Sequence, residues 1–259
     1  MLPEAQDVPK SRGGRRLGIG LGVTVLVLAV LAGAAWVADG IFRGMAEDAA
    51  ASAIEAQLPE GVSADLHVSI GGGLFLPQLL AGSFAEVTIT TDDASYKSVG
   101  FDAVVRAEGV PTDVSGTVRH VDARVTLDED AVNELLALPG TDPHLSLGES
   151  TVTYEDATRV LGFEIGYTVT ARASAEDSTV TLAPEHVKVT SPLGSLNLDD
   201  VVGRVLDKPV AVCVADRLPA VVDLDGIAVE PGSATLTLTA AKLPLDAAAL
   251  GTPGSCDAG

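Results

Sequence analysis

Apolar and polar residues alternate in two runs within the segment Gly61–Thr90. In the first run every second residue is apolar from Val62 to Ile70, and in the second the alternation starts at Phe84. A period of two residues is typical of a strand that has one buried face. The segment therefore predicts two strands that are joined by residues 71–83.

The connection between these strands is unusually apolar. It begins with the glycines Gly71–Gly73, while Pro77 and Gly82 stand where a short helix would begin and end. An apolar cluster of this density is costly on a soluble surface, so it either closes a core or forms the wall of an apolar groove. We hypothesise a wall or mouth of an apolar groove. Its members are Leu74, Phe75, Leu76, Leu79, Leu80 and Phe84.

The rest of the chain continues with strands and few helices. Asp128 and Asp199 are each followed by a short helical pattern, and aspartate at such a position can accept a hydrogen bond from a free backbone N–H. There is no alternation of strands with helices, so we expect an α+β fold with a highly curved, mostly antiparallel sheet. The clearest further strands are predicted over residues 99–107, 119–127, 161–171, 180–190 and 234–240.

An uncharged apolar run precedes this strand-rich part. Leu17–Ala38 comprises 22 residues without a charge, which span about 33 Å as a helix, enough to cross a hydrocarbon core of about 30 Å. Basic residues lie before the run, and Trp36 suits a membrane interface, so residues 1–16 should stay in the cytoplasm. A transmembrane signal anchor is favoured because the run exceeds the usual length of a signal peptide. A signal peptide cleaved near Ala32–Ala34 is the alternative, and either would export the remainder.

The apolar run leads into an amphipathic helical pattern over residues 39–58, which Pro59 ends. The sequence thus predicts four parts. These are a cytoplasmic basic tail (1–16), a transmembrane signal anchor (17–38), an exported domain (39–250) and a flexible tail (251–259).

Charge narrows the choice of partners. The chain has 36 acidic and 16 basic residues, a formal net charge of −20. Nucleic acid is excluded as a partner because its binding requires a basic face. The acidic charge of the part after residue 16 also argues against adhesion to anionic headgroups through a polybasic patch. If the protein binds lipid, affinity must come mainly from burial of acyl chains, at about 0.8 kcal/mol per methylene group.

Few residues in the sequence are of a kind and spacing that suggest catalysis, metal binding or a covalent cross-link. Cys213 and Cys256 are the only cysteines, and in an exported chain they predict one disulfide that ties the tail to the last strands. The sequence contains no GxSxG, HExxH or P-loop motif, and its four histidines are isolated from one another. We therefore predict no catalytic residue, no metal site and no cofactor.

The strand, the glycines, the sequence FLPQLLAGSF and the following strand resemble the LmeA-like phospholipid-binding family of actinobacterial envelope proteins. The resemblance covers roughly Glu47–Leu245 and is most specific over Ser69–Phe84. It implies a tubular lipid-binding fold, in which a curved antiparallel sheet wraps around a long helix and encloses an apolar tunnel. It also implies phospholipid ligands, phosphatidylinositol types among them, a periplasmic location, and a role in envelope lipid or lipoglycan assembly.

We therefore expect a non-catalytic phospholipid-binding protein of the cell envelope, anchored in the inner membrane by residues 17–38. A membrane-anchored scaffold that binds other proteins through a sheet edge is the alternative, and an envelope hydrolase is a third hypothesis.

Overall fold

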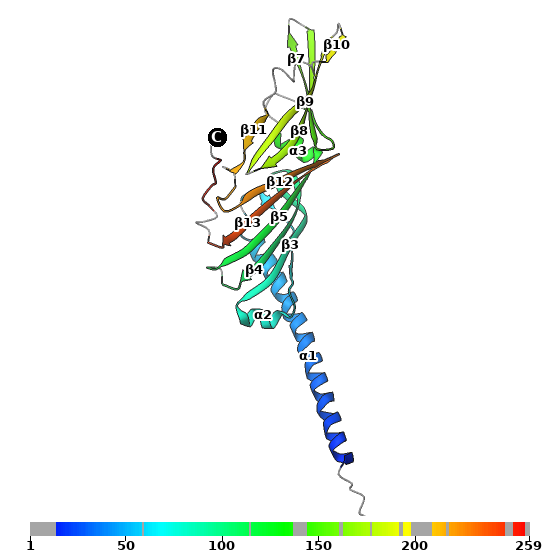
Figure 1. The fold of residues 1–259 in the computed structure, drawn as a ribbon, viewed down its shortest axis with the longest axis vertical. Coiled ribbons are helices and arrows are strands. Elements are labelled where there is room, and N and C mark those ends of the chain that lie inside the picture. Colours follow the sequence, from blue (N-terminus) through cyan, green and yellow to red (C-terminus); the bar gives the residue numbers. More distant parts are fainter. Residues whose placement is uncertain are drawn as a thin grey trace, which may run out of the picture.

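The computed structural model describes residues 14–58, 60–113, 115–136, 144–160, 163–176, 178–191, 194–197, 209–215, 218–246 and 251–256. It shows an elongated α+β molecule (Figure 1). A long helix, α1 (Gly14–Glu55), projects from one end, and two antiparallel sheets follow one another along the molecule. The predicted helix after Asp199 lies outside the described residues.

The sheet nearer to α1 has seven strands in the order β1-β3-β4-β5-β13-β12, with β2 also paired to β3. The last two strands come from the end of the chain, and β13 pairs with β5 from Ser233 opposite Asp128 to Pro244 opposite Thr117. The strands are β1 (Val62–Ser63), β2 (His67–Ile70), β3 (Ser83–Tyr96), β4 (Val99–Pro111), β5 (Thr117–Asp128), β12 (Asp223–Glu230) and β13 (Ser233–Pro244).

The second sheet has six strands in the order β10-β9-β8-β7-β6, with β11 also paired to β9. A buried apolar core joins it to the first sheet, because Leu145 and Ala173 of the second sheet pack with Val229 and Ala234 of the first. The strands are β6 (His144–Leu147), β7 (Thr151–Val160), β8 (Phe163–Glu176), β9 (Thr179–Ser191), β10 (Gly194–Asn197) and β11 (Val210–Cys213).

Two short helices confirm the capping signals in the sequence. Helix α2 (Phe75–Ala81) ends at Gly82, whose φ of 76° is in the left-handed region that glycine adopts without strain. Helix α3 (Glu129–Leu136) begins after Asp128, whose Oδ1 accepts a hydrogen bond of 2.7 Å from the Ala131 N–H. The end of α2 at Gly82 and the start of α3 after Asp128 therefore agree with local sequence chemistry.

The disulfide between Cys213 and Cys256 is also confirmed. The two residues are 43 positions apart in sequence, and their Cα atoms lie 5.9 Å from each other. The bond ties the tail to β11, at the second sheet.

The expected single sheet wrapped around a long helix needs correction. The described strands form two sheets, and neither of them is closed. Strands β6–β10 pair with their neighbours in sequence, and the chain then returns to the first sheet, where β13 pairs with β5. Helix α1 packs mainly against β2 and α2. The predicted strand from Val62 to Ile70 is also interrupted at residues 64–66, where the Leu66 N–H donates to Glu55 Oε1 of α1 at 3.0 Å.

Candidate functional site

An apolar groove of about 480 Å³ lies between the end of α1 and the first sheet. This volume is within the range of roughly 300–1,000 Å³ that is usual for small-molecule sites. Among the described residues that line it, Thr112 alone carries a polar side chain. The lining consists of Ala46, Ala50 and Ile54 of α1, Val68 and Ile70 of β2, Phe75 and Leu79 of α2, Phe84, Val87 and Ile89 of β3, Val105, Ala107, Val110 and Pro111 of β4, Val118 and Val121 of β5, Leu243 of β13, and Thr112 and Leu245.

The sequence pattern explains how the groove forms. On β3 and β4 the lining residues Val87 and Ile89, and Val105 and Ala107, are two positions apart, so they share one face of the sheet. On α1 the facing residues Ala46 and Ala50 are four positions apart and share one face of the helix. Because alanine side chains are short, the helix and the sheet leave a space that larger residues would fill.

Three of the six residues predicted for the lipid-contacting wall line this groove. Phe75 is only 4% exposed, and its ring stacks on that of Phe84 with the centroids 5.5 Å apart. Leu79 lines the groove while 44% of its surface remains exposed, which places it at the mouth.

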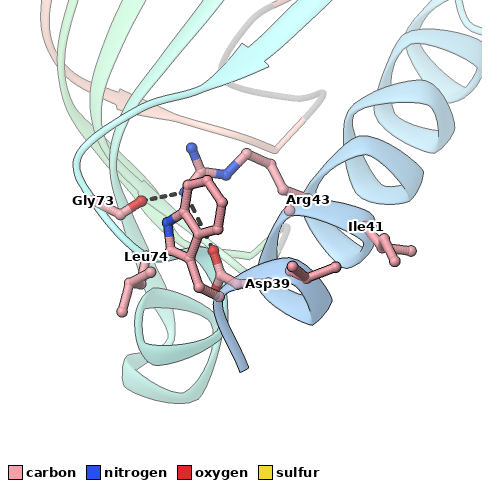
Figure 2. A pocket seen from close by; sticks show the side chains of 8 residues that line it. Asp39, Ile41, Arg43, Gly73 and Leu74 are labelled. Atoms are coloured by element: carbon pink, nitrogen blue, oxygen red, sulfur yellow. Dashed lines mark hydrogen bonds and ion pairs between the residues drawn. The ribbon is translucent and has the colours of Figure 1, made fainter. Parts of the chain in front are cut away.

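The other three residues lie elsewhere around α2. Leu80 is 88% exposed, and Leu76 is partly buried without lining the groove. Leu74 borders a neighbouring pocket of about 630 Å³, which also has Asp39 and Arg43 in its wall (Figure 2). Residues 75 and 79 therefore face the groove as a pair four positions apart, whereas 76 and 80 form a pair that does not.

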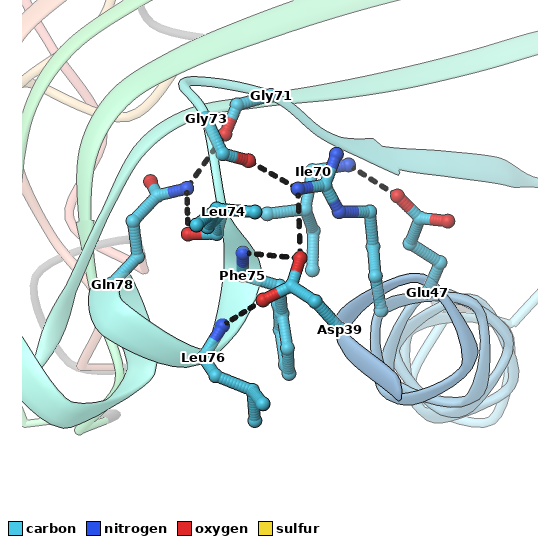
Figure 3. Close-up of polar contacts among 10 residues, drawn as sticks. Asp39, Glu47, Ile70, Gly71, Gly73, Leu74, Phe75, Leu76 and Gln78 are labelled. Atoms are coloured by element: carbon cyan, nitrogen blue, oxygen red, sulfur yellow. Dashed lines mark hydrogen bonds and ion pairs between the residues drawn. The ribbon is translucent and has the colours of Figure 1, made fainter. Parts of the chain in front are cut away.

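Asp39 of α1 holds the first turn of α2 in place. Its side chain is buried, with 6% exposed, and its Oδ2 and Oδ1 accept hydrogen bonds from the backbone N–H groups of Phe75 (2.8 Å) and Leu76 (2.7 Å) (Figure 3). The residue before α2 is Leu74, which has no side-chain group to cap the helix. Asp39 thus supplies from another helix the acceptor that the free N–H groups of α2 require.

Arg43 and Glu47 continue this polar stripe at intervals of four residues along α1. Arg43 Nη2 lies 3.5 Å from Asp39 Oδ2 and also donates to the Gly73 carbonyl. Glu47 Oε1 accepts the Ile70 N–H at 2.7 Å. The stripe therefore fixes residues 70–76 on α1. Arg43 Nε is buried and has no partner among the described residues.

Sequence analysis missed this stripe. Asp39, Arg43 and Glu47 stand on one face of a helix, a pattern that also fits an ordinary solvated face. The residues that they bind lie 23 to 37 positions further along the chain. One sequence signal was available for the stripe. The residue before α2 is Leu74, which cannot cap the free backbone N–H groups of the first turn, so an acceptor from elsewhere in the chain is needed.

Gln78 and Gly72 fix the other side of the connection. The Gln78 amide donates to the carbonyls of Gly71 (3.0 Å) and Leu74 (3.1 Å), and its oxygen accepts the Ala85 N–H at 2.7 Å. Gly72 has a φ of +82°, and a Cβ there would lie 2.4 Å from Ala85 Cβ. The close approach of the backbone at position 72 to Ala85 therefore requires glycine.

A polar cluster on the second sheet is the other notable electrostatic feature. The hydroxyls of Tyr167 (2.9 Å) and Tyr154 (3.1 Å) donate to Asp156 Oδ2. The hydrogen bond from the Ala157 N–H, followed by that from Tyr167, holds the pKa of Asp156 below its ordinary value of 3.8. The bond to Asp156, followed by burial, raises the pKa of Tyr167 to about 12. In the part of the chain that the structure describes, no group of three His, Cys, Asp or Glu residues is placed to hold a metal ion.

Comparisons with known proteins match the part of the chain that contains most of the groove. A family model described as LmeA-like phospholipid-binding matches residues 37–239. This range contains the polar stripe, α2 and all the residues that line the groove except Leu243 and Leu245. No curated protein and no solved structure matches the chain.

Proposed function

Because the chain belongs to the LmeA-like phospholipid-binding family, we propose that it is a non-catalytic envelope protein that holds a phospholipid acyl chain in the apolar groove. The observation that carries this proposal is the groove itself, with its volume of about 480 Å³ and its almost entirely apolar lining. Phe75, Leu79 and Phe84 form the wall at the α2 end. We also propose a tubular arrangement, in which strands of the first sheet and residues 46–54 of α1 lie on opposite sides of the bound acyl chain.

Burial in the groove stabilises an acyl chain relative to water. Burial of about ten methylene groups contributes about 8 kcal/mol, at about 0.8 kcal/mol each. Relative to lipid dissolved in water, that corresponds to micromolar affinity before the cost of association is subtracted. An acidic protein can therefore bind phospholipid through its acyl chains, with no basic surface for the headgroup.

The proposal includes an anchor. Residues 17–38 form a transmembrane signal anchor, 1–16 remain cytoplasmic, 39–250 form the exported domain on the periplasmic side, and 251–259 form a tail that the disulfide of Cys256 ties to β11. In support, the segment Leu28–Glu55 of α1 is long and apolar enough to cross a membrane. Large apolar side chains near its start, such as Leu28, Val30 and Leu31, are exposed. Ligands of the phosphatidylinositol type and a role in lipid or lipoglycan assembly rest on the family resemblance.

Native mass spectrometry of the full chain tests this function. We expect the wild type to carry bound phospholipid. Replacing Ala50 with Trp should remove most of it, because the indole would occupy the groove. Ala49→Trp is the matched control, since Ala49 is the neighbouring residue on the same helix and is exposed. A wild type without lipid, or equal lipid in both variants, would contradict the proposal.

A further inference from the structure

Helix α2 exposes apolar side chains outside the groove. Leu80 is 88% exposed and Leu74 is 50% exposed, while Leu79 reaches the surface from the groove's mouth. Scattered apolar residues are normal on a protein surface, but these belong to one short segment that carries no charge, FLPQLLA and the leucine before it. In a chain with a net charge of −20, such a segment differs from the rest of the surface.

The polar stripe fixes the position of α2 along α1. Asp39 holds the N–H groups of Phe75 and Leu76, and Arg43 holds the Gly73 carbonyl. Asp39 is also the first residue after the uncharged run 17–38. Figure 1 accordingly shows α2 at the end of the sheets from which α1 projects.

Bilayer dimensions place α2 and Asp39 at the depth of the headgroup layer. The hydrocarbon core is about 30 Å thick and the whole bilayer about 40–45 Å, so each headgroup layer is about 5–7 Å thick. At about 1.5 Å per residue, that thickness corresponds to about four residues of helix. If residues 17–38 fill the hydrocarbon core, residues 39–43 cross the headgroup layer, and these are the residues that hold α2.

Exposed apolar side chains also lie on α1 near this level. Trp36, Ile41, Phe42 and Met45 of α1 are all exposed. Trp36 borders the same pocket as Leu74. Tryptophan is enriched at membrane interfaces. A helix with an apolar face that lies at this depth buries that face at the boundary between headgroups and acyl chains.

We propose that α2 is an interfacial helix that inserts Leu80, together with Leu74, into the outer leaflet of the membrane that α1 spans. The mouth of the groove at Leu79 then opens onto that leaflet, and a phospholipid enters the groove directly from the bilayer without crossing water. This inference rests on the anchored lipid-binding function proposed above.

Fluorescence quenching by brominated phospholipid tests the insertion. The full chain with Leu80→Cys carries an environment-sensitive fluorophore, which the native cysteines cannot take up because they are paired in the disulfide. The protein is reconstituted into phosphatidylcholine vesicles with or without brominated acyl chains. The matched control is Leu196→Cys, an exposed leucine (67%) on β10 at the opposite end of the molecule.

We expect brominated lipid to quench the label at position 80 several-fold more than the label at position 196. Equal quenching at the two positions would overturn the insertion. A label at position 80 that becomes shielded in detergent as protein concentration rises, yet is not quenched in brominated vesicles, would show that a second copy of the chain covers α2, and would overturn it as well.

The bound phospholipid of the same samples is measured separately. Bound lipid with an unquenched label at position 80 refutes the insertion and leaves the lipid-binding function standing. Strong quenching without bound lipid supports the insertion and contradicts the lipid-binding function.

Discussion

At the scale of single residues, Asp39 determines where the groove's end wall lies. Its buried carboxylate holds the first turn of α2, and α2 carries Phe75 and Leu79 into the groove. Sequence patterns predicted three of the apolar residues that line this end of the groove but not the acidic residue that positions α2. A carboxylate that accepts bonds from backbone groups 36 and 37 positions away has no local signature.

Replacing Asp39 with Asn should loosen α2. Asparagine keeps one carbonyl oxygen, so it can accept one of the two N–H groups but no longer pairs with Arg43. Loss of a cap at a helix start commonly costs stability, and we expect amide hydrogen exchange at Phe75 and Leu76 to accelerate about five- to thirtyfold. Asp48→Asn, an exposed position on the same helix, is the control. Unchanged exchange in Asp39→Asn would refute the capping role.

Tyr167 offers a second test at this scale. Because the bond to Asp156 is the largest cause of its raised pKa, Asp156→Asn should bring the pKa of Tyr167 from about 12 toward the ordinary 10.0, as followed by ultraviolet absorbance during alkaline titration. The protonated hydroxyl is favoured in the folded state. Its contribution to stability is therefore fully present below pH 10 and is lost as the pH rises through about 12. A pKa that stays near 12 in the variant would show another cause.

At the scale of elements, regular periodicity was a good guide and irregular joins were not. The alternation through Phe84, Val87 and Ile89 correctly predicted the beginning of β3, and Gly82 correctly predicted the end of α2. The strand expected from Val62 to Ile70 is broken because Glu55 of α1 binds the Leu66 N–H. The division into two sheets could not be predicted either, since alternation reveals a buried face and not the neighbouring strand.

Gly72 tests how tightly the connection before α2 is built. We expect Gly72→Ala to lower the free energy of unfolding by about 2 kcal/mol or more, because it combines a left-handed backbone with a steric clash. Gly73→Ala is the control, since its φ is +110° but nothing lies within 4 Å of an added Cβ. The control should lose less, about 1 kcal/mol. Equal losses in urea denaturation would show that the close approach to Ala85 contributes nothing.

At the scale of the whole molecule, the groove and the disulfide lie in different parts of the fold. The groove lies between α1 and the first sheet, whereas the disulfide joins the tail to β11 of the second. The sequence predicted the disulfide correctly, on the expectation that the chain is exported. It could not predict the size of the groove, because the space depends on how closely Ala46 and Ala50 approach the sheet.

Removal of the disulfide should therefore separate stability from function. Replacing Cys213 and Cys256 with Ser opens a link between residues 43 positions apart, which should lower the free energy of unfolding by about 2–4 kcal/mol. Denaturant unfolding measures this loss. Bound phospholipid at low temperature should stay at the wild-type level. Loss of lipid from a folded double variant would show that the second sheet contributes to the lipid site.

Photo-crosslinking tests most directly whether an acyl chain occupies the groove. The full chain is incubated with a phospholipid that carries a photoactivatable group within one acyl chain, and the crosslinked peptides are identified by mass spectrometry. Our account predicts crosslinks in residues 46–54 of α1 and in β3, β4 and β5, and a large reduction of these crosslinks in Ala50→Trp. Crosslinks confined to β6–β10, or to the uncharged run of α1 alone, would contradict it.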